Sequence, residues 1–137
     1  MEFNFVKAGT PDFDPQTYVC MLLAIAKADK DNGPPEYTFI RRQAQRLGVD
    51  YDHFHKITDK NFPIEKQKVS RLTALVILKD AIALASLDGN FTLPEKQRVY
   101  GYAEKLDITR KEVDELITLV NEYHRHIDNW RKLIRPR

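Results

Sequence analysis

The feature that most constrains the fold is an internal repeat. At an offset of 59 residues (88 minus 29), residues 23–54 align with residues 82–113 without a gap. Each aligned half reads as helix, acidic turn, helix, short turn and helix. Two such units predict a bundle in which related three-helix repeats pack their apolar helices around a pseudo-twofold axis. The identical pairs are Ala24/Ala83, Ala26/Ala85, Asp29/Asp88, Pro35/Pro94, Glu36/Glu95, Ala44/Ala103 and Leu47/Leu106.

Helical periodicity extends over most of the chain. Strand-like alternation is confined to the four residues FNFV near the start, so the predicted fold class is all-α. Asp14, Thr92 and Thr109 are predicted helix N-caps, and the two threonines are each followed by a glutamate at the capping-box position. Gly48 is predicted to end a helix in the left-handed conformation. The expected helices are 15–28, 35–47, 50–57, 69–87, one that begins after Thr92, and about 109–133, with a bend or break near His124 as an alternative in the last.

The length and composition favour a single soluble domain in a reducing compartment. The 22 Lys and Arg residues nearly balance the 20 Asp and Glu residues, so the net charge of +2 supplies no strong field for nucleic acid or anionic lipid. Cys20 has no disulfide partner, and its apolar run is far shorter than the roughly 20 residues that span a bilayer. We therefore expect a cytoplasmic protein without a transmembrane segment. The expected single compact domain of six to seven helices covers residues 1–137, with repeat one at about 15–60, repeat two at about 69–121 and a C-terminal helical extension at about 122–135.

A family resemblance rests on residues 83–109, ALASLDGNFTLPEKQRVYGYAEKLDIT. An alanine-rich helix that ends in Asp-Gly, a turn, Pro-Glu and an amphipathic helix resembles the TerB-like domain, a tellurite-resistance-associated helical family also found at the front of some DnaJ-type proteins. The first repeat departs from this pattern at Lys30, where the family usually has glycine. The resemblance covers about residues 18–119. It implies a non-enzymatic helical domain of bacterial stress-associated systems, in which some members are suggested to bind metal or calcium through acidic residues.

The acidic turns between helices carry the candidate metal ligands. Hard cations such as calcium prefer six to eight oxygen ligands, so one turn would need carbonyl groups, water or the other repeat's acids to complete a shell. An EF-hand is excluded, because the position that requires a bidentate glutamate is Val99 or Ile40. The candidate cofactor is thus none, or a weakly bound divalent cation such as calcium. The candidate ligands are Asp88, Asn90, Glu95 and Asp80, with the matching Asp29, Asp31 and Glu36.

A structural interpretation of the same residues is favoured. A capping box accounts for the residue types at Thr92 and Glu95, and each capping group contributes about 1 kcal/mol to helix stability. Asp80 and Asp88 lie on one helical face, which would aim two carboxylates at one spot. The alternative is that Lys79 and Asp80 reach the surface or pair with charged neighbours, because unpaired charge is rarely buried.

The sequence predicts recognition of another protein and no enzymatic activity. Cys20 lies in an apolar run, and neither a serine nucleophile elbow nor a phosphate-binding glycine loop is present. The basic C-terminal segment, HRHIDNWRKLIRPR, is expected to be a solvated helix end that packs Trp130 inward. Contact of this segment with nucleic acid or a membrane surface is the less favoured alternative. The expected function is a non-catalytic TerB-like module for protein–protein recognition, with a divalent-cation responsive domain as the alternative and a homo-oligomer left open.

Overall fold

The computed structural model describes residues 4–29, 33–87 and 91–136, and all of their regular structure is helical. The sequence-predicted helices are confirmed, with ends that shift by a few residues. The connector after α3 contains a short 3₁₀ turn directly after Pro63, which cannot continue an α-helix. The elements are α1 (Pro15–Ala28), α2 (Pro34–Leu47), α3 (Tyr51–Ile57), η1 (Ile64–Lys66), α4 (Arg71–Ala85), α5 (Leu93–Lys105) and α6 (Arg110–Ile134).

The predicted caps explain where the helices begin and end. Asp14 accepts a hydrogen bond from the Thr17 amide at 3.2 Å, and Pro15 follows at the first helical position, where a missing amide costs nothing. Both predicted capping boxes are present, at Thr92 and at Thr109. Gly48 ends α2 with φ of +73°, as predicted.

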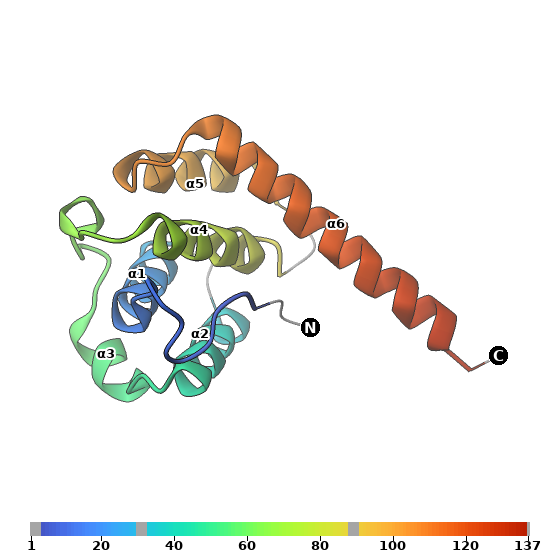
Figure 1. Ribbon diagram of the computed structural model, residues 1–137, viewed down its shortest axis with the longest axis horizontal. Helices are drawn as coiled ribbons and strands as arrows, with labels where there is room; N and C mark the ends of the chain where they lie inside the picture. The colour runs from blue at the N-terminus through green and yellow to red at the C-terminus, as the bar shows by residue number, and fades with distance from the viewer. Residues whose placement is uncertain (1–3, 30–32, 88–90, 137) are drawn as a thin grey trace.

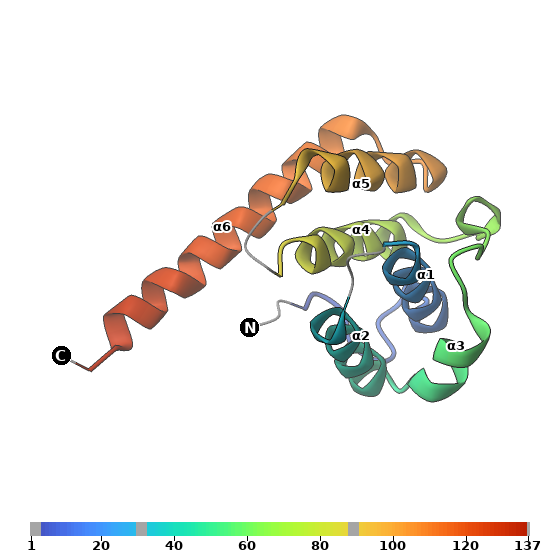
Figure 2. The same cartoon turned by 180° about the vertical axis from the view of Figure 1, so that it is seen from behind.

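Two groups of three helices meet where α1 packs against α4 (Figure 1). In the first group α2 and α3 both contact α1, and in the second α5 and α6 both contact α4. Figure 2, which shows the reverse side, places α4 between the α5–α6 pair and the α1–α2–α3 group. Helix α4 therefore has neighbours from both groups.

The α1 and α4 helices supply the centre of the core. Eight hydrophobic residues of α1 and seven of α4 are among the buried residues, whereas α2 and α5 bury only one face. Burial all round a helix requires neighbours on every side, and the partners are apolar side chains of α2, α3, α5 and α6. The most enclosed apolar side chains of the two central helices are Val19, Met21, Leu22, Leu23, Ile77, Leu78 and Ile82.

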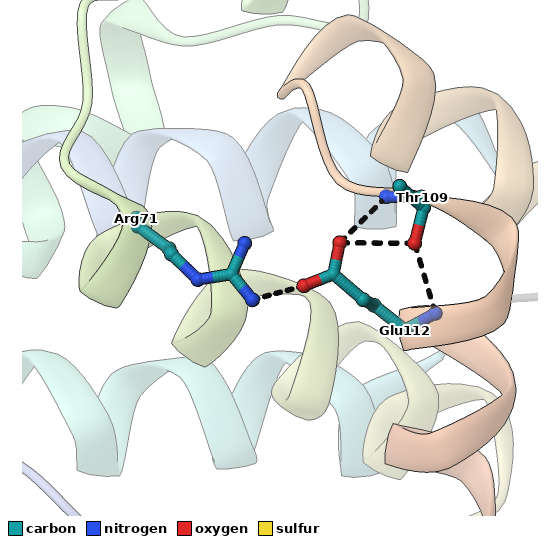
Figure 3. A network of polar contacts seen from close by, with 3 residues as sticks. All are labelled: Arg71, Thr109 and Glu112. Atoms are coloured by element: carbon teal, nitrogen blue, oxygen red, sulfur yellow. Dashed lines mark hydrogen bonds and ion pairs between the residues drawn. The ribbon is translucent and has the colours of Figure 1, made fainter.

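A polar network fixes the start of α6 against the start of α4 (Figure 3). Glu112 accepts hydrogen bonds from the Thr109 amide at 3.1 Å and the Thr109 hydroxyl at 2.9 Å, and its other oxygen pairs with the Arg71 guanidinium. These hydrogen bonds, that of Arg71 first, lower the pKa of Glu112 to about 2. The capping box thus also joins two helices.

The α6 helix continues well beyond the other helices. It is a single element through Ile134, without the alternative break near His124. In Figures 1 and 2 its C-terminal half extends past the ends of α4 and α5. The sequence analysis predicted that Trp130 packs inward. Instead, Trp130 is 52% exposed and donates a hydrogen bond to His126 Nε2 at 3.1 Å. The expectation was wrong because, in the described part of the chain, no helix covers this side chain.

Candidate functional site

Two described residues that border the predicted acidic turns lie between the two groups of helices. Asp29 ends α1, and Glu95 lies in the first turn of α5. Three of the predicted ligands, Asp31, Asp88 and Asn90, lie outside the described residues. Of the remaining four, the structure brings Asp29 and Glu95 to one small pocket between α1, α4 and α5.

This pocket is narrow, and one of its lining side chains is positively charged. Its volume is about 30 Å³, which is room for a water molecule or a single ion. Arg98 also lines it and approaches Asp29, with 3.5 Å between the guanidinium nitrogen and the carboxylate oxygen. Burial raises the pKa of the neighbouring Tyr102, so its hydroxyl stays protonated at neutral pH. The Arg98 guanidinium thus already neutralises part of the Asp29 charge that a bound metal ion would otherwise neutralise.

The two glutamates of the predicted set act as helix caps. Glu95 Oε1 accepts hydrogen bonds from the Thr92 amide at 3.0 Å and the Thr92 hydroxyl at 2.8 Å. Glu36 Oε2 accepts from the Gly33 amide at 2.9 Å, which is the corresponding bond in the first repeat. The observed bonds agree with the structural interpretation of these residue types.

Asp80 does not join the pocket that Asp29 and Glu95 line. The residue is 3% exposed, and its side chain turns towards α1, where the Tyr18 hydroxyl donates to Oδ2. The Lys79 ammonium lies 2.8 Å from Oδ1, and Lys79 is also 3% exposed. The alternative that Lys79 and Asp80 reach the surface is therefore wrong, whereas the expected pairing with a charged neighbour is confirmed.

The cluster of Tyr18, Lys79 and Asp80 was not predicted as a unit. Burial raises the pKa of Asp80, and the Lys79 ammonium, the Tyr18 hydroxyl and the Arg46 charge act in the opposite direction. The sequence signal was the Lys-Asp pair inside an otherwise apolar helix. Tyr18 could not be identified as its partner, because that contact depends on how α1 and α4 face each other. The cluster holds a charge pair within the core, and both carboxylate oxygens are occupied.

The N-terminal segment lies over one side of this buried cluster. Arg46 donates to the Val6 carbonyl and, at 2.7 and 3.1 Å, to Oε1 of the fully buried Gln43. The Phe5 ring centroid lies 5.7 Å from the Lys79 ammonium, within the range of a cation–π contact. The residues before α1 are thus attached to the bundle by polar contacts.

The exposed side of α6 is the other candidate site. Large apolar side chains remain in contact with solvent along it, and basic residues surround them towards the C-terminal end. Helices normally place such residues against a neighbour. The exposed apolar residues of α6 are Leu119 (54%), Trp130 (52%), Leu133 (74%) and Ile134 (70%).

Comparison of the chain with protein-family models, with curated proteins and with solved structures found no match. Over residues 4–29, 33–87 and 91–136, no group of three or more His, Cys, Asp or Glu side chains is placed to hold a metal ion. The predicted ligand set extends beyond these ranges. No helix in the described part of the chain is both long enough and apolar enough to cross a membrane.

Proposed function

We propose that the chain is a non-catalytic, TerB-like helical module that recognises another protein through α6. One observation carries the proposal: the C-terminal half of α6 projects from the bundle with Trp130, Leu133 and Ile134 more than half exposed. A contiguous apolar surface of this kind on a soluble protein typically marks an interaction site. Tryptophan is also among the residues that contribute most to binding at protein interfaces.

The stability of the exposed C-terminal part of α6 supports the same proposal. An isolated helix shorter than about 12–15 residues is marginal in water, and packing of an apolar face normally stabilises it. The first part of α6 obtains this stabilisation from Val113 and Val120, which are buried against the bundle. Beyond Ile127, Ile134 on the corresponding face is 70% exposed among the described residues, so a partner would supply the missing burial.

The TerB-like part of the proposal is supported by local geometry that recurs in both halves. Gly48 after α2 and Asp107 after α5 occupy the same aligned position, and both have positive φ, +73° and +61°. The amide that follows each bonds back in the same way, from Val49 to the Ala44 carbonyl at 2.8 Å and from Ile108 to the Ala103 carbonyl at 2.9 Å. Together with the shared pattern of helix contacts, this favours duplication of a three-helix unit.

Photo-crosslinking in cells that express the chain tests recognition. A benzoylphenylalanine placed at Leu133 is expected to form a protein adduct. The matched control is the same residue placed at Leu93, another exposed leucine (66%) that lies at the start of α5. Equal yields at the two positions, or no adduct at Leu133, would contradict recognition through α6.

A divalent-cation responsive domain is the second candidate. It is favoured by the presence of Asp29 and Glu95 at one pocket, since acids from both repeats would have to contribute ligands. Calorimetric titration with calcium, on the unaltered chain and on Asp88→Asn, tests it. Absence of heat together with an unchanged Tm at millimolar calcium would remove this candidate without affecting the first.

A further inference from the structure

A second apolar pattern runs along α6, beside the residues that face the bundle. Its members are spaced alternately by three and four residues, which is the spacing of a coiled-coil seam. Leu116 and Tyr123 are half-buried at the edge of the bundle, and the other members are exposed. The seam consists of Leu116, Leu119, Tyr123, His126, Trp130 and Leu133.

From this seam we infer that α6 pairs with the α6 helix of a second copy of this chain in antiparallel orientation. The inference rests on the proposed function and names the partner that the module recognises. Residues 116–133 form about 27 Å of helix at the rise of about 1.5 Å per residue, which is about two and a half heptads. In the antiparallel register, Leu116 faces Leu133, Leu119 faces Trp130 and Tyr123 faces His126, and the twofold axis repeats each layer.

The distribution of charge along the seam favours this orientation. Glu115 and Glu122 flank its N-terminal half, and Arg125 and Lys132 lie on the same side of its C-terminal half. All four are exposed. An antiparallel copy brings Glu115 near Lys132 and Glu122 near Arg125, so each acid meets a base of the second copy. A parallel pair would place acids beside acids and bases beside bases.

The shape of the molecule favours the same arrangement. The other helices gather around the N-terminal half of α6, while its C-terminal half projects freely (Figure 1). Two parallel copies would bring both bundles to the same end of the pair, where they would compete for space. In the antiparallel pair the projecting half of each copy lies along the outer side of the other copy's α6, and the bundles separate.

The apolar flank on the other side of the seam would add to the interface. Val120 on this flank is buried against the bundle, whereas Ile127 is half-buried and Ile134 is exposed. Pairing would therefore bury Ile134 of each copy, whereas Val113 and Val120 are already enclosed by their own bundle. Such burial is what the exposed C-terminal half lacks in a single copy.

Sedimentation equilibrium of the full chain tests the inference. At about 100 µM, well above the micromolar Kd at the weak end for interfaces of this kind, the mass should be twice the 16.0 kDa of one chain. Leu133→Glu should weaken the dimer by roughly 100-fold, because it places a charge in the apolar seam of both copies. The control Ile57→Glu, at an exposed residue (62%) of α3, should leave the dimer unchanged.

A charge exchange tests the register. Glu115→Lys alone and Lys132→Glu alone should each weaken the dimer by roughly threefold to tenfold, and the two combined should restore it. A monomer at 100 µM, a dimer that Leu133→Glu does not weaken, or a double variant weaker than both singles would overturn the inference. A monomer that still gives a crosslink to a different protein at Leu133 would overturn the dimer and leave the proposed function intact. A monomer that instead binds anionic vesicles would overturn both.

Discussion

Replacement of Lys79 by methionine probes the buried charge pair. The substitution keeps the length of an unbranched side chain and removes the ammonium that lies 2.8 Å from Asp80 Oδ1. Methionine also suits the site because the aligned positions in the first repeat are the apolar Cys20 and Met21. Asp80 would remain buried, with the Tyr18 hydroxyl left as the hydrogen-bond donor to its carboxylate. The free energy of unfolding should therefore fall.

The size of this loss in unfolding free energy depends on whether the buried carboxylate stays charged or binds a proton. Removal of one partner of a buried pair costs about 3–5 kcal/mol. Asp80 can limit this cost by binding a proton, and at pH 7 that costs about 4 kcal/mol, since its unfolded pKa is about 3.9 and each unit is about 1.4 kcal/mol. The two routes agree on about 4 kcal/mol.

The sign of the pH dependence follows from the same reasoning. In Lys79→Met the folded pKa of Asp80 is raised above its unfolded value, so the folded state binds an extra proton and loses stability as pH rises through that window. The loss should shrink to about 1.5 kcal/mol at pH 5, where protonation of the unfolded carboxyl requires only about one unit. In the unaltered chain Lys79 pairs with the carboxylate, and this trend should be weaker.

Urea unfolding followed by far-UV circular dichroism at pH 7 and pH 5 measures both effects. The control is the triple variant Tyr18→Phe, Lys79→Met, Asp80→Met, which removes every polar member of the cluster. It should unfold within about 1–2 kcal/mol of the unaltered chain, because apolar replacement of a whole buried pair is often neutral or stabilising. A loss below 1 kcal/mol for Lys79→Met at pH 7, or a loss equal at pH 5, would refute the reasoning.

Three further predictions concern single residues. Arg71 and Thr109 lower the pKa of Glu112 to about 2. The contribution of Glu112 to stability is therefore present above about pH 4.5 and is lost as pH falls through 2. The difference in urea midpoint between the unaltered chain and Glu112→Gln should vanish at about pH 2. Burial raises the pKa of the Cys20 thiol, so its reaction with a disulfide reagent at pH 8 should be roughly 100-fold slower in the folded chain than in urea, and equal rates would contradict this. Gly48→Ala should cost about 1 kcal/mol by thermal or urea unfolding, whereas Asp107→Gly should gain about 0.5 kcal/mol, because both positions have positive φ; changes of the same sign would argue against backbone strain as the cause.

The helix ends were predictable because their signals are local. Asp14, Gly48 and Thr92 each act on backbone groups within four residues, so the sequence alone contains the whole interaction. The bond between Tyr18 and Asp80 was not predictable, since it depends on the mutual rotation of α1 and α4 about their axes. The exposure of Trp130 was missed for a related reason: an apolar stripe indicates which face seeks a neighbour and does not show whether one reaches it.

The two halves of the chain differ most where the exposed surface arises. After their aligned caps, Asp50 and Thr109, the first half forms α3, which ends at Ile57, and the second forms α6, which continues to Ile134. In the proposed duplication the added length of α6 contributes little to the shared core, because its C-terminal half extends beyond the ends of α4 and α5. A segment that bundle packing does not require, yet which carries large apolar side chains on one face, needs another source of stabilisation. Docking of that face on a partner meets this need, and so the place where the halves diverge is also where recognition is proposed.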